Sequence, residues 1–232
     1  MKKNIFYIML LLLTSAVTFS SCDNDSSAGY TRITYYPVLT LNGDATMHVD
    51  KGSAFVDPGC AAELNGEDVS SSITVSGSVN SAKSGVYTLT YSAINEDGFS
   101  ASVSRTVIVT DPNDAKEGVF YTDANSYRDY SGQKAFGSSY EVVITNNDNG
   151  TYHVDDLFGG WYSQRAGYGT NYNMEGDVSF ADDGTMTLIS SQVAGWGDSL
   201  VGFSGKFDAA SGSYTWDAEY VSSMKFHVVL SK

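Results

Sequence analysis

The sequence predicts an all-β protein with two successive antiparallel β-domains, the first of them a small sandwich. Two observations lead to this fold class. No stretch keeps helical periodicity for three turns, and apolar residues instead alternate with polar ones over runs of four to nine residues. These runs are separated by Asn-Gly, Asp-Gly and Ser-Gly pairs, which are typical of the turns between strands.

The N-terminus has the layout of a secretory signal peptide over residues 1–21. Lys2 and Lys3 precede an unbroken apolar run over residues 5–13, which is followed by small and polar residues up to Cys22. An apolar run of this length is too short to cross a hydrocarbon layer of about 30 Å as a helix. We therefore expect the remainder of the chain to be exported.

Residues 22–36 are predicted to form a lipid anchor and tether. The stretch "FSSC", which ends at Cys22, resembles the lipobox of bacterial lipoproteins, and this resemblance implies lipidation of the Cys22 thiol. Several acyl chains hold a protein on a membrane more firmly than one chain does. The alternative is an export disulfide between Cys22 and Cys60, the two cysteines of the chain.

The segment "DNDSSAG" after Cys22 is acidic and small, as a solvated tether would be. It also resembles the export tag that directs Bacteroidetes lipoproteins to the outer face of the outer membrane. In enterobacteria an Asp directly after the cysteine indicates the inner membrane instead. Without residues 1–21 the chain has 11 basic and 27 acidic residues, a net charge of −16, which argues against nucleic acid as a partner.

Residues 37–110 are predicted to form an Ig-like β-sandwich. Tyr87, Leu89, Tyr91 and Ala93 alternate with polar residues, and a turn at residues 95–98 leads into a second alternating run. The motifs "VDPG", "ITVSGSVN", "SGVYTLTYSAINEDG" and "RTVIV" resemble the bacterial surface Ig-like module that is also found in a pesticidal crystal toxin. Because such modules mostly act as spacers, the resemblance implies little chemistry.

Residues 111–116 are interpreted as a linker, and residues 117–232 as a C-terminal antiparallel β-domain. The same sequence pattern occurs three times in this half, in "NDNGTYHV", "ADDGTMTL" and "AASGSYTW". Each consists of a polar turn, a glycine, a hydroxyl residue and an alternating strand. The glycine suits the left-handed backbone conformation of such turns. Seven or eight strands joined in this way predict a meander, either barrel or sandwich. We expect residues 115–232 to fold alone.

The C-terminal half also resembles a domain of Bacteroidetes lipoproteins, on the basis of "GTYHVDDLFGGWY", "GYGTNYNMEGDVSF" and the "GWGDS" turn. Members of that family resemble accessory lipoproteins of SusC/SusD-type outer-membrane importers. The resemblance implies capture of a glycan or peptide at the cell surface, as a component of nutrient uptake.

The sequence contains no motif that is typical of an enzyme, a metal site or a cofactor site, and we expect no enzyme activity, metal or cofactor. The three histidines are far apart and no paired-cysteine motif or G-x-S-x-G elbow is present. The pairs 155–156 and 182–183 supply adjacent carboxylates, but adjacent strand residues point to opposite faces. The stretch "TNNDNGTYHVDD" lacks the first Asp and final Glu of a calcium loop, so we interpret it as a hairpin turn.

The candidate ligand site is the stretch "DLFGGWYSQRAGYGTNY" over residues 156–172, together with the "GWGDS" turn. Large rings set between glycines pack poorly in regular strands, which places them on a loop or at a barrel mouth. Aromatic faces suit sugar C–H groups or peptide side chains. The predicted ligand-binding residues are Trp161, Tyr162, Arg165, Tyr168, Trp196 and Asp198.

We expect both tryptophans to lie in one exposed patch with Arg165 and Asp198 at its rim. The alternatives for Trp161 and Trp196 are packing in the core or rim, and docking to a partner protein. The function that the sequence favours is a non-enzymatic surface lipoprotein that binds glycan or peptide. The alternatives are a structural subunit that docks on an importer without binding free ligand, and a hydrolase.

Overall fold

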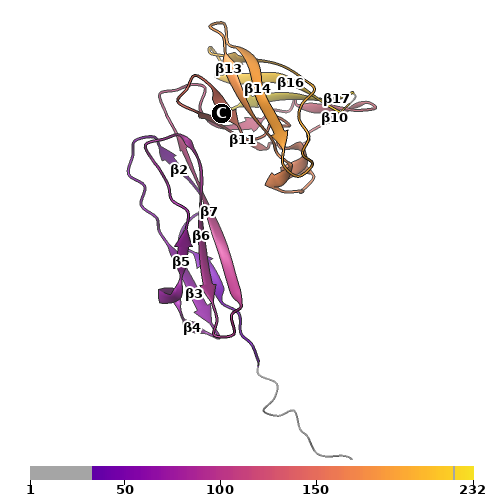
Figure 1. The fold of residues 1–232 in the computed structure, drawn as a ribbon. Coiled ribbons are helices and arrows are strands. Elements are labelled where there is room, and N and C mark those ends of the chain that lie inside the picture. The colour runs from indigo at the N-terminus through magenta and orange to yellow at the C-terminus, as the bar shows by residue number, and fades with distance from the viewer. Residues whose placement is uncertain (1–32, 222) are drawn as a thin grey trace, which may run out of the picture.

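The computed structural model describes residues 33–221 and 223–232, and it confirms the all-β prediction. The Ig-like domain and the second β-domain follow each other along the chain and are joined near Thr110 (Figure 1). No helix within the described residues is long and apolar enough to cross a membrane. The predicted signal peptide and the predicted lipidation site, Cys22, lie outside the described residues.

The Ig-like domain packs a three-stranded sheet, in the order β1-β3-β4, with a four-stranded sheet, in the order β2-β7-β6-β5. Its elements are β1 (Val38–Leu41), β2 (Thr46–Asp50), β3 (Cys60–Leu64), β4 (Glu67–Asp68), the 3₁₀ turn η1 (Ser70–Ser72), β5 (Thr74–Ser76), β6 (Gly85–Ile94) and β7 (Ser100–Thr110). Strand β2 pairs with β7 in parallel, whereas β6 pairs with β7 antiparallel over the whole length of β6.

The predicted hairpin is β6–β7, and it carries the core of the Ig-like domain. Leu89, Tyr91 and Ala93 are buried as the alternation predicts. Arg105 of β7 is also fully buried, which the sequence pattern does not indicate. Its guanidinium forms an ion pair with the Asp57 carboxylate at 3.1 Å and donates hydrogen bonds to two backbone carbonyl groups. The Arg105 charge is therefore compensated inside the domain.

The second domain is a barrel-like ring of eight strands, which resolves the choice between barrel and sandwich. Its elements are β8 (Gly118–Thr122), β9 (Tyr127–Asp129), β10 (Gln133–Ala135), β11 (Glu141–Asn146), β12 (Tyr152–Val154), the π-helical turn η2 (Trp161–Arg165), the 3₁₀ turn η3 (Thr170–Tyr172), β13 (Met174–Phe180), β14 (Thr185–Val193), β15 (Gly202–Asp208), β16 (Ser213–Tyr220) and β17 (Met224–Ser231). Strand β8 pairs with β11, and from β11 each strand pairs with the next one along the chain as far as β17. Leu230 of β17 then pairs with Thr122 of β8, which closes the ring, while β9 and β10 extend it beside β17.

The three repeated turns of the second domain have the predicted geometry. Gly150, Gly184 and Gly212 all have positive φ, between 67° and 87°. At Gly184 a Cβ atom would lie only 2.1 Å from the carbonyl oxygen of Phe207, so a side chain is excluded by space as well as by conformation.

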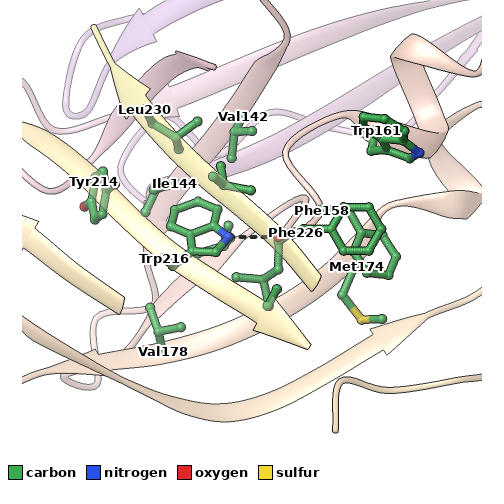
Figure 2. Packing of buried hydrophobic residues seen from close by; sticks show 14 of the residues in the cluster. Val142, Ile144, Phe158, Trp161, Met174, Val178, Tyr214, Trp216, Phe226 and Leu230 are labelled. Carbon is green, nitrogen blue, oxygen red and sulfur yellow. Dashed lines mark hydrogen bonds between the residues drawn. The ribbon is translucent and has the colours of Figure 1, made fainter. Parts of the chain in front are cut away.

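The barrel interior is filled by aromatic and aliphatic side chains from every part of the ring (Figure 2). Trp216 of β16 lies near the middle, and its indole N–H donates to the carbonyl oxygen of Leu157 at 2.8 Å. Phe158 packs on Phe226 with ring centroids 4.4 Å apart. Leu157 and Phe158 belong to a loop, not a strand, so a connecting segment enters the barrel and completes its core.

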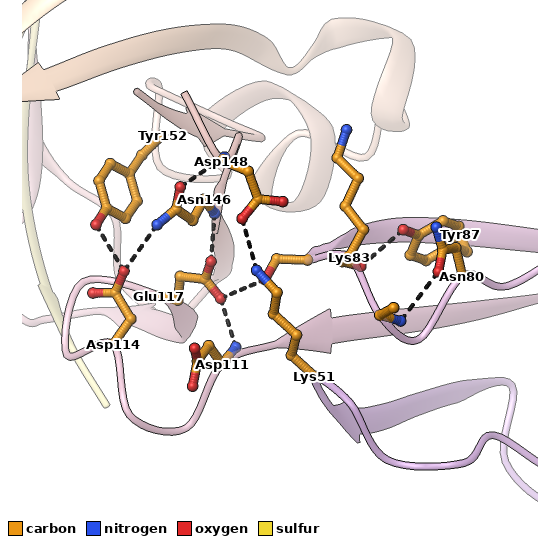
Figure 3. A network of polar contacts seen from close by, with 12 residues as sticks. Lys51, Asn80, Lys83, Tyr87, Asp111, Asp114, Glu117, Asn146, Asp148 and Tyr152 are labelled. Carbon is orange, nitrogen blue, oxygen red and sulfur yellow. Dashed lines mark hydrogen bonds and ion pairs between the residues drawn. The ribbon is translucent and has the colours of Figure 1, made fainter. Parts of the chain in front are cut away.

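Hydrogen bonds and an ion pair join the two domains (Figure 3). Glu117 is 1% exposed, and its carboxylate accepts from the Ser84 hydroxyl of the Ig-like domain at 2.9 Å. It also accepts from the backbone N–H groups of Asp111 and Asn146. Lys51 pairs with Asp148 at 2.7 Å across the same junction. The residues around the predicted linker therefore hold the domains together.

Candidate functional site

The loop that follows β12 is organised around one buried carboxylate, that of Asp156. One oxygen accepts from the backbone N–H groups of Phe158 and Met174, at 2.9 and 3.0 Å. The other accepts from the N–H of Gly160 and the hydroxyl of Ser163, both at 3.0 Å. Four donors thus converge on a side chain with no solvent exposure, which fixes the start and the end of the loop.

Burial raises the pKa of Asp156 to about 6, while its four hydrogen bonds act in the opposite direction. The hydrogen bonds of the Asp156 carboxylate are all made to groups of its own loop and of the first residue of β13. Asp155 points elsewhere: its carboxylate accepts from the backbone N–H of Val143, and burial raises its pKa well above the ordinary value. The two adjacent acids therefore bond different backbone groups and do not converge on one ligand.

Gly159 and Gly160 allow the loop to turn back into the barrel. Both have positive φ, and a Cβ atom at Gly160 would lie 2.5 Å from Cβ of Tyr140. The turn leads directly into η2, whose first residue is Trp161. The expectation that Trp161 is exposed is wrong, because its side chain is 3% exposed and belongs to the barrel core.

Two arginines cover Trp161. The guanidinium carbon atoms of Arg165 and Arg128 lie 4.1 and 4.7 Å from the centroid of its ring, within the range of cation–π attraction. The Nε–H of Arg165 also donates to the carbonyl oxygen of Phe136 at 2.8 Å. Arg165 is therefore engaged with the buried tryptophan, in contrast to its predicted place at the rim beside Trp196.

An aromatic patch nevertheless exists, centred on Trp196. The Trp196 ring lies 4.8 Å from that of Tyr162 and 4.9 Å from that of Tyr172, in edge-to-face contacts. Tyr168 contacts Tyr162, Tyr172 and Trp196, and the Trp196 ring stacks on Tyr220 at 6.2 Å. We call these five side chains, Tyr162, Tyr168, Tyr172, Trp196 and Tyr220, the aromatic patch.

The outer part of the aromatic patch faces solvent. Tyr168 is 56% exposed and Trp196 is 40% exposed, whereas Tyr162 and Tyr172 are partly buried beneath them and Tyr220 is buried. Two large rings are thus accessible on a base of packed rings. Such a base holds the exposed rings in place without a ligand, which lowers the entropy cost of binding.

The turn that carries Trp196 is fixed against η3. Gly195 donates its N–H to the carbonyl oxygen of Asn171 at 2.7 Å, and a Cβ atom there would lie 2.7 Å from the Tyr172 ring. An isolated bridge between Val193 and Asp198 closes the turn. The glycine before Trp196 is therefore required by the close approach of two loops.

Asp198 is exposed and lies at the edge of the aromatic patch. Its carboxylate accepts from the Tyr220 hydroxyl at 2.7 Å. Burial, followed by this hydrogen bond to an anion, raises the pKa of Tyr220 far above the ordinary value. The Tyr220 hydroxyl therefore remains protonated, and one Asp198 oxygen remains available to a ligand.

The other chemical alternatives correspond to ordinary structural features. His153 and His227 pair with Asp177 and Asp217, at 3.1 and 2.9 Å. The suspected calcium segment is the β11–β12 hairpin, as predicted, with left-handed backbone at Asp148. Within residues 33–221 and 223–232, no three His, Cys, Asp or Glu side chains are grouped closely enough to hold a metal ion.

Sequence reasoning missed three parts of this site. Tyr172 is the last residue of the glycine-rich stretch at residues 156–172. Its place among the other aromatic residues of that stretch was the signal that could have identified it as part of the site. Tyr220 alternates with core residues along β16 and carries no signal of its own. Arg128 reaches Trp161 only because β9 pairs with β17, a contact between segments about a hundred residues apart.

The comparisons with known proteins agree with this architecture. A family model for a bacterial surface protein Ig-like domain matches residues 39–109, and a C-terminal-domain family model ("-like, C-terminal domain") matches residues 109–232, more than half of the chain. The chain belongs to this family. The lipoprotein BT2262 from Bacteroides thetaiotaomicron is 39% identical, with a TM-score of 0.76 over 85% of this chain and 100% of that chain.

Two structures of the Clostridium perfringens protein ZmpB are much less similar. One contains an M60 catalytic domain with two CBM51 domains; it is 18% identical and covers 53% of this chain and 14% of that chain, with a TM-score of 0.29. The other contains CBM51-2 in complex with GlcNAc and INT domains; it is 16% identical and covers 84% and 44%, with a TM-score of 0.27. Neither similarity is strong enough to support an argument. No curated protein matches the sequence.

Proposed function

We propose that this protein is an outer-membrane surface lipoprotein, anchored through Cys22, that binds a glycan or peptide without acting on it chemically. The observation that carries the proposal is the aromatic patch, in which Trp196 and Tyr168 are exposed on a base of packed rings. Exposed aromatic faces beside a free carboxylate oxygen, that of Asp198, suit a ligand with both C–H faces and hydrogen-bond donors.

The arrangement of the domains supports this role. The described chain begins at the end of the Ig-like domain that lies away from the barrel (Figure 1). A lipid at Cys22 would therefore leave the Ig-like domain between the membrane and the barrel. The interdomain contacts of Glu117 and Lys51 would hold the barrel at the outer end of this spacer.

The role that follows is an accessory component of nutrient uptake beside a SusC/SusD-type importer. The similarity to a Bacteroides lipoprotein and to a bacterial surface domain supports the location at the surface. Ligand binding rests on the aromatic patch alone.

A glycan and peptide array, probed with the purified protein and with its Trp196→Ala variant, tests the proposal. We expect at least one ligand class to bind the natural protein and to lose most of its signal with the variant. The control is Tyr130→Ala, which removes another exposed ring of the barrel that is not part of the aromatic patch. Absence of any signal, or equal loss with both variants, would contradict the proposal.

A further inference from the structure

A group of exposed apolar side chains lies at the end of the Ig-like domain that faces away from the barrel. Strand β7 ends at Thr110, beside the barrel, and its first residue, Ser100, lies roughly 30 Å away along the extended strand. The β6–β7 turn, over residues 95–99, is therefore at the far end, where the described chain also begins (Figure 1). The exposed apolar residues of these two segments, which we call the apolar end, are Ile33, Tyr35, Tyr36, Val38, Ile94 and Phe99.

Exposed apolar surface is concentrated at this end of the Ig-like domain. Among the described residues up to Thr110, nine large apolar side chains are exposed, and six of them belong to the apolar end. The other three are the single valines Val56, Val75 and Val86. Scattered exposed apolar residues are normal in proteins, whereas a group of them marks a surface that contacts a membrane or another protein.

Asn95 holds the two segments of the apolar end together. Its side-chain amide donates to the carbonyl oxygen of Tyr35 at 2.7 Å. Its Oδ1 atom accepts from the backbone N–H groups of Asp97 and Phe99, at 3.1 and 2.8 Å. The Phe99 ring packs against the Tyr36 ring with centroids 5.2 Å apart, although Tyr36 is 56% exposed and Phe99 is 46% exposed. The fold therefore holds these rings in place at the surface.

The position of the apolar end along the chain indicates what covers it. Ile33 lies eleven positions after Cys22, so a lipid on the Cys22 thiol is at most about 40 Å from this end even if the chain between them is fully extended. An anchor at this separation keeps the bilayer at a high effective concentration, so that weak apolar contacts suffice. Tyrosine is enriched at lipid–water interfaces, and aliphatic side chains and phenylalanine supply apolar surface that lipid can bury.

The charges around the apolar end determine which lipid surface it suits. Residues 33–38 and 94–100 contain no lysine or arginine. Glu67, Glu96 and Asp97 line a cavity beside the apolar end. Because anionic headgroups repel carboxylates, this end suits a surface of zwitterionic lipid that it contacts through apolar side chains, in contrast to a basic patch that binds anionic lipid.

We propose that the apolar end of the Ig-like domain rests on the bilayer surface. The rings of Tyr36 and Phe99 and the side chains of Ile33 and Ile94 insert at the lipid–water interface. This contact orients the Ig-like domain on the membrane, so that the barrel, and with it the aromatic patch, faces outward. The inference rests on the anchor at Cys22 in the proposed function, and it is independent of ligand binding by the aromatic patch.

Quenching by brominated lipid, which reaches only fluorophores within the bilayer, tests this inference. Residues 22–232 carry Cys60→Ala, so that a maleimide lipid in phosphatidylcholine vesicles couples to Cys22 alone. This chemical anchor makes the result independent of whether cells lipidate Cys22, which fractionation of Cys22→Ala tests separately. Phe99→Trp adds a reporter at the apolar end, and we expect the added emission to fall about twofold or more when the phosphatidylcholine is brominated.

The matched control is Val86→Trp, at the barrel end of the same hairpin, where Val86 pairs with Ile108 and is 48% exposed. Its added emission should not change. Ile33→Ser with Ile94→Ser, combined with Phe99→Trp, separates insertion from mere nearness to the anchor, and we expect this variant to recover most of the emission. Thermal melts verify that all variants are folded.

Three results would overturn the proposal. Unchanged emission of Phe99→Trp would indicate that a protein partner covers the apolar end instead of lipid. Equal quenching of Val86→Trp would show that the domain has no fixed orientation on the membrane. Quenching that persists in the serine variant would show that the anchor alone brings the reporter to the bilayer.

Discussion

Replacement of Asp156 by alanine should loosen the loop on which the aromatic patch depends. The substitution removes the acceptor for three backbone N–H groups and for the Ser163 hydroxyl. The hydroxyl can rotate to another acceptor, whereas the backbone groups cannot move without the loop. Residues on both sides of η2 therefore lose their common anchor.

The magnitude follows from two opposing effects. Each buried N–H group left without a partner costs about 1–3 kcal/mol, which gives about 6 kcal/mol for three. At neutral pH the natural protein also bears the cost of a buried charge, and a pKa raised from 3.8 to about 6 corresponds to about 3 kcal/mol that the substitution removes. The expected net loss in the free energy of unfolding is about 3 kcal/mol.

Urea unfolding at neutral pH, followed by tryptophan fluorescence, measures this loss. The control is Ser163→Ala, which removes one of the four donors and should cost about 1 kcal/mol. If Asp156→Ala costs no more than Ser163→Ala, the carboxylate does not organise the loop and the reasoning is refuted.

The same carboxylate should make stability depend on pH. Because the folded-state pKa is raised, the folded protein holds this proton more tightly than the unfolded chain between about pH 4 and pH 6. The stability from this group is full below about pH 4 and is lost as the pH rises through 6. Asp156→Asn should therefore be more damaging, relative to the natural protein, near pH 4 than near pH 7, and a difference that is independent of pH would contradict the assignment.

Further predictions concern the patch, the domain junction and the anchor. Trp196→Ala should weaken ligand binding by about 1–3 kcal/mol with little change in the melting temperature. Trp161→Ala should instead lower the free energy of unfolding by about 3–5 kcal/mol. Binding titrations and thermal melts separate the two effects, and equal destabilisation would place both rings in the core. Glu117→Ala should loosen the domain junction, so that limited proteolysis cuts near Thr110 faster than in the natural protein; an unchanged cleavage rate would show that the contact is dispensable. Cys22→Ala should release the protein from the membrane fraction of expressing cells, and retention equal to that of the natural protein would contradict lipidation there.

Much of the fold could be predicted because strand alternation is a local property. The buried faces of β6, β16 and β17 follow directly from it, and so do the glycine turns. Closure of the ring depends on the pairing of Thr122 with Leu230, which are distant in sequence and carry no local mark. Alternation therefore predicted the strands but could not distinguish a barrel from a sandwich.

The candidate site was predicted in part, for a similar reason. Glycines beside large rings correctly indicated a loop that brings Tyr162, Tyr168 and Trp196 together. They could not show which rings turn inward, because that depends on the anchor at Asp156 and on the space inside the barrel. Trp161 follows Gly160 into the core, whereas Trp196 follows Gly195 to the surface.

Acrylamide quenching of tryptophan fluorescence, with and without the ligand class found on the array, tests the central claim most directly. The chain has three tryptophans, and Trp161 and Trp216 are at most 3% exposed, so the quenchable emission comes from Trp196. If the aromatic patch is the binding surface, saturating ligand should remove most of this quenching, and the Trp196→Phe variant should show little quenching with or without ligand. Ligand binding that leaves the quenching of Trp196 unchanged would contradict the account.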